Sequence, residues 1–360
     1  MKKQKLFFLF LLLQANPINI HMHNKSLIES NLTQNIFHIF ISFFLVIGIG
    51  GCKKEPVYRI HGEALGTFYS ISYTGIEHER LLYEADSVLK SVSDRFSIFD
   101  SLSTLSRINR GMEVKPDRDF IEVIRRSLAI SELTNGAFDI TLAPLIDLWG
   151  FGKTEKKDPT PEMIDSVKQI IGYQKISILN DRLVKEDDRI RINMNAIAKG
   201  FAADQLACFL YDKGYRNFIV EVGGEIVTKG TKSGKPWKVG IQVPVEQKDG
   251  PIDATYAFPL QDKAIATSGS YRNYFEEDGI RYMHIIDPES GRPKTSRLLS
   301  VTVIAGDCMT ADALATAFML LGEKESMRIA EENHYEAYFI LSDDNGKFRT
   351  LKTAGFPEEK

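Results

Sequence analysis

Two segments toward the carboxyl-terminal end carry side chains that could hold a metal ion and accept a proton. Residues 284–293 (HIIDPESGRP) join an imidazole and a carboxylate to tight-turn residues. Residues 310–317 (TADALATA) place Asp312 and Thr316 four positions apart in a run of strong helix formers, so we expect both side chains on one helical face. Carboxylate and hydroxyl oxygens suit Mg²⁺, which keeps its other positions for water and substrate phosphate. Taken alone, the pair is also typical of a capped helix whose apolar residues face the core.

Residues 193–200 (NMNAIAKG) form a candidate phosphate site. We expect a strand to end and a helix to begin here, where backbone amides can meet a phosphate, and Lys199 would add a positive charge. The alternative is that Asn193 and Asn195 cap the helix while Lys199 faces solvent.

Residues 136–139 (GAFD) follow the expected end of another helix and form a candidate ring-binding site. Phe138 could pack against the planar ring of a ligand, and Asp139 could hydrogen-bond to it. A core Phe138 and a capping Asp139 would explain the same pattern.

These segments, with several others, resemble the motifs of the ApbE flavin transferases, which move FMN from FAD onto a Ser or Thr of a target protein. The resemblance covers about residues 58–350, and the motifs occur in family order. They are ALGTFYSI from Ala64, LSRIN from Leu105, TNGAFDITLAPLIDLWGFG from Thr134, NMNAIAKG from Asn193, VEVGGEI from Val220, ATSGSYRNYF from Ala266, and the HIIDP and ADALATA runs. Several matches at compatible spacing are more specific than any single motif.

The resemblance implies a set of site residues. Mg²⁺ would be held by the backbone carbonyl of Ala196 and the side chains of Asp312 and Thr316. The positions that would contact FAD, the substrate, are Leu65, Phe99, Ala137, Phe138, Asp139, Asn193, Lys199 and Ile286.

Three of these positions depart from the family pattern. Asn193 stands where the family commonly has Asp, which removes a negative charge near the metal but keeps hydrogen-bonding capacity. Leu65 replaces a frequent Met, and Phe99 replaces a frequent Tyr, so apolar packing persists while a phenol hydrogen bond is lost.

His284 is the candidate general base for the attacking hydroxyl, because an imidazole titrates near neutral pH. A histidine beside Ile285 and Ile286 is also typical of one that only packs a turn.

The implied reaction is Mg²⁺-dependent transfer of FMN from FAD to a Ser or Thr hydroxyl through a phosphoester bond, with release of AMP. Such phosphoryl transfer depends mainly on positioning and charge neutralisation. The alternatives are an FAD pyrophosphatase, in which water replaces the hydroxyl, and a non-catalytic FAD-binding lipoprotein. By resemblance, the acceptor would be an extracytoplasmic flavoprotein such as a subunit of the sodium-pumping NADH:quinone reductase or of the Rnf complex. A formal net charge of −3 and the lack of a long basic run argue against a nucleic-acid partner.

The amino-terminal region indicates export. Residues 1–51 hold two apolar stretches that resemble signal-peptide cores and are too short to make convincing membrane spans. The second precedes Ile49-Gly50-Gly51-Cys52, which resembles a lipoprotein cleavage box in which Cys52 receives the lipid. A plain secretory signal or an uncleaved anchor remains open, as does a translation start at Met22. We therefore expect a signal region over 1–51, a lipidated Cys52 with a tether to residue 57, and a periplasmic domain anchored to the inner membrane.

The catalytic domain is expected over residues 58–355 as a single large unit, with a division into two subdomains left open. Strands arrive both in runs and between helices, which favours an α+β fold with mixed sheets and packed helices. One helix over 81–99 should bury Leu82, Ala85, Val88, Leu89 and Val92, and residues 189–194 (RIRINM) should form a strand. Two cysteines besides Cys52 are too few for a disulfide framework. We expect Cys208 to be buried and Cys308 to be more accessible.

Overall fold

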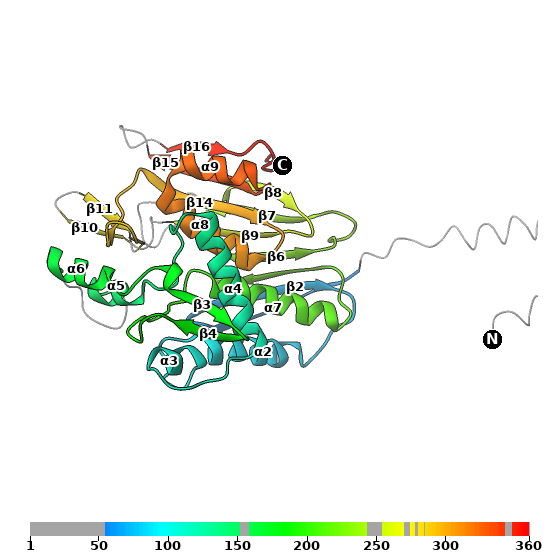
Figure 1. Cartoon of the computed structure of the whole chain (residues 1–360). Coiled ribbons are helices and arrows are strands. Elements are labelled where there is room, and N and C mark those ends of the chain that lie inside the picture. The colour runs from blue at the N-terminus through cyan, green and yellow to red at the C-terminus, as the bar shows by residue number, and fades with distance from the viewer. Residues whose placement is uncertain are drawn as a thin grey trace, which may run out of the picture. The chain divides into compact units, whose positions relative to one another are not determined.

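The computed structural model describes residues 55–151, 158–242, 254–269, 274–277, 280–283, 285–342 and 348–359 (Figure 1). The signal region, Cys52 and His284 lie outside these residues. Residues Glu55–Lys360 form one compact unit. Among the described helices, none combines the length and the apolar character that crossing a membrane requires.

The helices are distributed along the described part of the chain, with strands between them. They are α2 (Leu81–Phe96), α3 (Thr104–Asn109), α4 (Arg118–Leu133), α5 (Ala143–Leu148), α6 (Pro161–Lys168), α7 (Ala198–Asp212), α8 (Cys308–Leu321) and α9 (Glu323–Glu332), with the 3₁₀ turn η1 (Tyr173–Lys175).

The main sheet has eight strands in the order β1-β2-β5-β6-β9-β14-β15-β16, and each neighbouring pair is antiparallel. Its strands are β1 (Val57–Ala64), β2 (Thr67–Thr74), β5 (Phe218–Val222), β6 (Glu225–Lys229), β9 (Ala264–Gly269), β14 (Leu298–Ala305), β15 (Glu336–Ser342) and β16 (Phe348–Lys352). The two-stranded sheets pair β3 (Ile176–Leu179) with β4 (Arg182–Lys185), β7 (Trp237–Gln242) with β8 (Ala254–Leu260), β10 (Tyr274–Glu277) with β11 (Ile280–Met283), and β12 (Ile286–Asp287) with β13 (Arg292–Pro293). The mixture of a large sheet with packed helices is the expected α+β fold.

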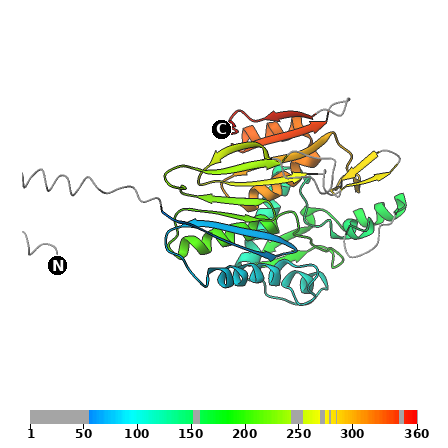
Figure 2. The same ribbon diagram turned by 180° about the vertical axis from the view of Figure 1, so that it is seen from behind.

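The two faces of the sheet bury different side chains because side chains alternate along each strand. In β14, Val301 and Val303 face the main core. Helices α2, α7 and α8 contact the sheet on that side (Figure 1). Ile304 belongs to the second core on the other face, which the β7–β8 pair covers (Figure 2). This two-sided burial explains why β14 has buried apolar residues at both odd and even positions, among them Val301 and Val303 on one face and Ile304 on the other.

Helix α2 begins where its periodicity predicts but ends at Phe96 instead of residue 99, and its buried stripe matches the prediction only in part. The buried residues are Leu81, Ala85, Leu89, Val92 and Phe96. Leu82, predicted in the stripe, is exposed, and Val88 is half-buried. On a helix of 3.6 residues per turn, residues 81 and 82 lie equally far from the centre of the stripe formed by Ala85, Leu89, Val92 and Phe96, so the packing of neighbouring elements and not the periodicity decides that Leu81 is the buried one.

Residues 189–194 are not a strand, contrary to expectation. The side chain of Asn109 donates to the carbonyl of Ile192 at 2.7 Å and accepts its N–H at 2.8 Å. The N–H of Asn193 donates to the carbonyl of Ile140 at 2.8 Å. A side chain and a loop thus take the backbone bonds that a neighbouring strand would have made, although Ile190 and Ile192 are buried.

The two cysteines have the reverse of their expected burial. Cys308 is fully buried at the start of α8, and Cys208 is exposed on α7. Both are free thiols within the described residues, so the fold there contains no disulfide.

Candidate functional site

Helices α7 and α8 meet at Gly200, and this contact fixes the position of Asp312. The N–H of Gly200 lies in the first turn of α7, where it has no helical acceptor, and it donates to Asp312 Oδ2 at 2.9 Å. Thr316 lies one turn further along α8, and its hydroxyl donates to the carbonyl of Asp312 at 3.3 Å. Asp312 and Thr316 therefore occupy one helical face, as their spacing predicts.

Asp204 also ties α7 to the start of α8. Its two carboxylate oxygens accept the N–H groups of Cys308 at 2.9 Å and Met309 at 2.8 Å. Burial raises the pKa of Asp204 to about 7, although these two hydrogen bonds oppose the shift. Asp204 thus holds the amino-terminal turn of the helix that carries the predicted metal ligands.

Lys199 lies between two carboxylates at this junction. Its ammonium makes a short contact with Glu225 Oε1 at the start of β6 and is 3.7 Å from Asp312 Oδ1. The side chains of Glu225 and Asp312 are 3% and 7% exposed, whereas that of Lys199 is 35% exposed. The cluster therefore consists of two buried carboxylates and one partly exposed ammonium.

Two carboxylates share one ammonium in this cluster. Burial raises the pKa of Glu225 to about 8, the nearby charge of Asp312 adds to the rise, and Lys199 opposes it. The two carboxylates raise the pKa of Lys199 above its ordinary value although burial acts against them. Glu225 Oε2 is buried and accepts no hydrogen bond from any described residue. Ionising both carboxylates would leave one negative charge uncompensated beside an unsatisfied oxygen, so a further cation would stabilise the ionised form of Glu225.

The donor set at the junction fits Mg²⁺ better than a metal that is fully enclosed by protein. No group of three or more His, Cys, Asp or Glu side chains that could hold a metal occurs in the part of the chain that the structure describes. The predicted set of one carboxylate, one hydroxyl and one backbone carbonyl leaves positions for water and phosphate, as Mg²⁺ usually requires.

Asn193 precedes α7, and Lys199 lies in its first turn. The side-chain oxygen of Asn193 accepts the N–H of Asn195 at 2.8 Å, and Asn193 is buried. A helix begins in this segment as predicted, two residues after Ala196, but no strand leads into it in this described segment. Its N-cap is Ile197, so neither Asn193 nor Asn195 caps it.

Phe138 and Asp139 make the contacts expected of structural residues. Phe138 is buried in the main core. Asp139 accepts the N–H and the hydroxyl of Thr141, both at 2.7 Å, and the N–H of Tyr173 at 2.8 Å. Burial raises the pKa of Asp139 despite these bonds. Flavin contacts at these two positions stay predictions. In the structure, Phe138 packs in the core, and Asp139 accepts hydrogen bonds from Thr141 and Tyr173.

Three hollows lie beside the predicted FAD contacts. One of about 520 Å³ is lined by Ala137 and Asp139, together with Asp287, the neighbour of buried Ile286. A second, of about 360 Å³, is lined by Asn193 and by Ile98, the neighbour of Phe99. The third, of about 480 Å³, surrounds the turn between β1 and β2 that contains Leu65.

The turn at Leu65 lies at the same end of the sheet as Glu225. Leu65 and Gly66 both have positive φ angles, 55° and 73°, as a two-residue hairpin turn requires. The N–H of Gly223, two residues before Glu225, donates to the carbonyl of Phe68 at 2.9 Å. The β1–β2 and β5–β6 turns are therefore neighbours, although they are about 160 positions apart in sequence order.

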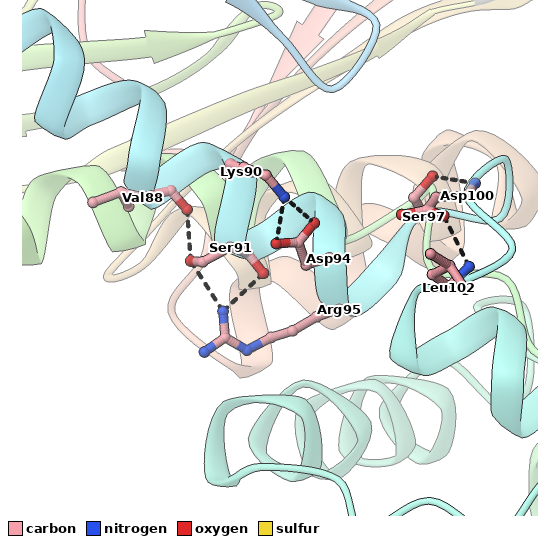
Figure 3. A network of polar contacts seen from close by, with 8 residues as sticks. All are labelled: Val88, Lys90, Ser91, Asp94, Arg95, Ser97, Asp100 and Leu102. Carbon is pink, nitrogen blue, oxygen red and sulfur yellow. Dashed lines mark hydrogen bonds and ion pairs between the residues drawn. The ribbon is translucent and has the colours of Figure 1, made fainter.

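A polar network orders the loop that carries Phe99, whose side chain is 70% exposed. Ser97 Oγ accepts the N–H of Asp100 at 3.0 Å, and Asp100 Oδ1 accepts that of Leu102 at 2.8 Å (Figure 3). In the last turns of α2, Arg95 donates to the carbonyl of Ser91 at 2.9 Å (Figure 3). The loop thus holds Phe99 at the surface through its backbone rather than through burial of the ring.

Glu225 is the site residue that the sequence reasoning missed. It lies within the motif VEVGGEI, which was recognised without a role for its last carboxylate. The available signal was its position: Glu225 begins β6, and alternation along the strand puts it on the same face as Val227, which packs against the main core. A carboxylate at a predicted buried position implies a charged partner.

Gly200→Ala is predicted to destabilise the protein and to impair its site. A Cβ at this position would lie 2.7 Å from the carbonyl carbon of Cys308 and 2.8 Å from the Cβ of Asp312. Because a helix backbone must move, we expect a loss of about 1–3 kcal/mol in the free energy of unfolding. Urea unfolding measures this loss. Gly306→Ala is the control, since no atom lies within 4 Å of its added Cβ. Equal stability of the two variants would contradict the close packing of α7 on α8.

The comparisons with known proteins agree with the resemblance in the sequence. The model of the ApbE family matches residues 65–339. The FAD:protein FMN transferase of Vibrio cholerae is 38% identical over 321 residues, which cover 86% of this chain and 94% of that protein. The protein of the same name from Haemophilus influenzae is 34% identical, with 88% of this chain and 95% of that protein covered.

Solved structures give the same result. The flavin transferase ApbE from Vibrio cholerae superimposes with a TM-score of 0.75 at 35% identity and covers 84% of this chain and 98% of its own. The apo form of the Pseudomonas stutzeri flavinyl transferase ApbE has a TM-score of 0.75 at 34% identity, covering 84% of this chain and 96% of its own. The fold and the order of the elements are therefore shared with both.

Proposed function

The chain belongs to the ApbE family, and from that membership we propose that it transfers FMN from FAD to a Ser or Thr hydroxyl of a target protein and releases AMP. Its curated relatives are transferases that use FAD, which supports flavin transfer in general. The observation that carries the finer proposal is the buried cluster of Lys199, Glu225 and Asp312, because two buried carboxylates around one ammonium, with one carboxylate oxygen that accepts no hydrogen bond from a described residue, suit a divalent cation beside a pyrophosphate.

In the proposed reaction, the acceptor oxygen attacks the phosphorus of the FMN half of FAD. A new P–O bond forms, the bond to the AMP phosphate breaks, and AMP leaves. His284 would take the proton of the acceptor hydroxyl. Mg²⁺, when bound by Ala196, Asp312 and Thr316, neutralises charge on the pyrophosphate. Lys199 adds a second positive charge, and Asn193 offers an amide to the substrate without a competing negative charge.

The test is incubation of the purified full-length protein with FAD, Mg²⁺ and a candidate acceptor, an extracytoplasmic subunit of a sodium-pumping NADH:quinone reductase or an Rnf complex. We expect covalent flavin on the acceptor and an equal amount of AMP. The control is the same acceptor with its target Thr replaced by Val. Free FMN and AMP with either acceptor would indicate a pyrophosphatase instead. Unchanged FAD in the presence of Mg²⁺ would indicate a flavin-binding protein without catalysis.

We also propose that Cys52 is lipidated and anchors the protein on the periplasmic side of the inner membrane. Glu55 follows Cys52 by three residues and accepts a hydrogen bond from Thr74 at 2.8 Å, at the outer end of the β1–β2 hairpin. The Leu65 turn is at the other end of β1, roughly 25 Å away for an eight-residue strand. This arrangement supports an anchor at one end of the hairpin and a substrate site at the other.

Cys52→Ser is predicted to release the protein from the membrane fraction. Acyl chains on Cys52 would be the anchor, and the serine hydroxyl does not receive them. Cell fractionation followed by immunoblotting measures the distribution, and Cys208→Ser is the matched control that should remain membrane-bound. If Cys52→Ser stays in the membrane fraction, the apolar segment before residue 52 is an uncleaved anchor.

A further inference from the structure

The ammonium of Lys199 has two acidic neighbours, and it is bound by the one that is not a predicted metal ligand. Glu225 Oε1 makes the short contact, while Asp312 Oδ1 is 3.7 Å away. Within the described residues, these two carboxylates are the ion-pair partners of Lys199. The position of the ammonium is therefore decided by the balance between Glu225 and Asp312.

This balance matters because a lysine and a divalent cation would compete for Asp312. Two cations a few ångströms apart repel strongly where burial lowers the effective dielectric constant. An ammonium bound directly to Asp312 would have to be displaced before a metal ion could use that oxygen. An ammonium bound to Glu225 leaves Asp312 accessible to the metal ion. It also stays close enough to contact the FAD phosphate that the metal ion would bind.

We infer that Glu225 is a positioning residue, which binds the Lys199 ammonium and so keeps Asp312 available to a divalent cation. The inference rests on the proposed function, because it assumes that Asp312 serves as the metal ligand. Glu225 acts through Lys199 and needs no contact with the substrate.

The surroundings of Glu225 suit this role. It is nearly fully buried at the first position of β6, directly after the Gly223–Gly224 turn that bonds to Phe68. A strand at the centre of the sheet holds the carboxylate in place, whereas Lys199 has a long side chain that can adjust. The buried Oε2, which accepts no hydrogen bond from a described residue, can receive the ammonium when it is pushed away from Asp312.

The test is calorimetric titration of the full-length protein with Mg²⁺ in the absence of FAD. Four forms are compared: wild type, Glu225→Gln, Lys199→Met and the double variant. We expect Glu225→Gln to weaken Mg²⁺ binding by about tenfold or more, because the freed ammonium then binds Asp312. Lys199→Met should tighten binding. In that background, Glu225→Gln should have little further effect, since no ammonium is left to position.

Two control variants distinguish an effect of the position of the Glu225 carboxylate on Mg²⁺ binding from an effect of total charge. Glu225→Asp keeps the charge but shortens the side chain by one methylene, so it should weaken Mg²⁺ binding if the position of the carboxylate matters. Glu221→Gln removes one charge from the adjacent strand, where Glu221 accepts a hydrogen bond from Ser70 at 3.3 Å, and it should bind Mg²⁺ as wild type does. Melting temperatures identify any variant that fails to fold.

An equal weakening by Glu225→Gln with and without Lys199 would overturn the inference, since Glu225 would then act on the cation directly. Wild-type affinity in Glu225→Gln would also overturn it. If the wild type binds no Mg²⁺, both this inference and the proposed metal dependence fail. If the expected pattern is found without flavin transfer to any acceptor, the positioning role stands and the proposed reaction fails.

Discussion

Asp312→Ala is expected to abolish Mg²⁺-dependent release of AMP from FAD while most of the protein remains folded. The substitution removes the one carboxylate in the predicted oxygen set, and phosphoryl transfer depends on charge neutralisation at the phosphates. It also leaves the Gly200 N–H without its acceptor, which should cost about 1–3 kcal/mol in the free energy of unfolding. Loss of a charge that raises the pKa of Glu225 offsets part of that cost. AMP release with and without Mg²⁺, together with the melting temperature, measures both effects.

Asp312→Asn separates the metal from the fold. The amide oxygen can still accept the Gly200 N–H, so stability should stay near that of wild type. The negative charge is lost, and Mg²⁺-stimulated turnover should therefore fall as far as in Asp312→Ala. If either variant keeps normal Mg²⁺-stimulated transfer, Asp312 does not belong to the metal site.

Local patterns in the sequence predicted helices such as α8 and α6 where they form, but not the exact buried face of α2. The run of Ala and Leu residues around Asp312 predicts a helix, and α8 forms there, capped by Asp307, which accepts the N–H of Thr310 at 2.8 Å. Likewise, Thr160 before Pro161 marks the start of α6. These signals are local because the capping bonds span only a few residues.

Contacts between distant segments could not be predicted in the same way. The bonds between Asn109 and Ile192 join positions 83 apart and replace the expected strand at residues 189–194. Gly200 and Asp312 are separated by 112 positions, and Lys199 and Glu225 by 26. No periodicity records such pairs, so the sequence could assign Lys199 and Asp312 to one site only through the family resemblance, and it left Glu225 without a role.

The burial of Cys308 also depends on contacts with distant segments, which the local sequence does not record. Cys308 lies just before residues 310–317 (TADALATA), and this position led to the expectation of a more accessible thiol. Its burial comes from the neighbouring strands, where the carbonyl groups of Ile226 and Ile265 lie 3.7 and 3.8 Å from its sulfur. Burial raises the pKa of this thiol, which makes it a poor nucleophile. We therefore assign no chemistry to Cys308.

His284→Ala is predicted to slow flavin transfer by about 100-fold or more at saturating FAD, with little change in FAD affinity, because a general base assists in the transition state. His284 itself lies outside the described residues. The neighbouring segment is held firmly: the N–H of Lys294 donates to the carbonyl of Ile285 at 3.0 Å, and Ile286 is buried. The FAD dissociation constant, the melting temperature and the saturated rate are measured on one preparation.

Trp149→Phe supplies the matched control for a role in packing alone. The indole N–H of Trp149 donates to the carbonyl of Gly291 at 2.8 Å and so ties the turn that follows Ile286 to helix α5. Removing this bond should lower the melting temperature while the saturated rate stays near that of wild type. If His284→Ala behaves in the same way, with weaker FAD binding, a lower melting temperature and a normal saturated rate, His284 packs the turn and is not the base. A slow saturated rate at normal FAD affinity instead requires the imidazole in the transition state, since neither binding nor folding would account for the loss.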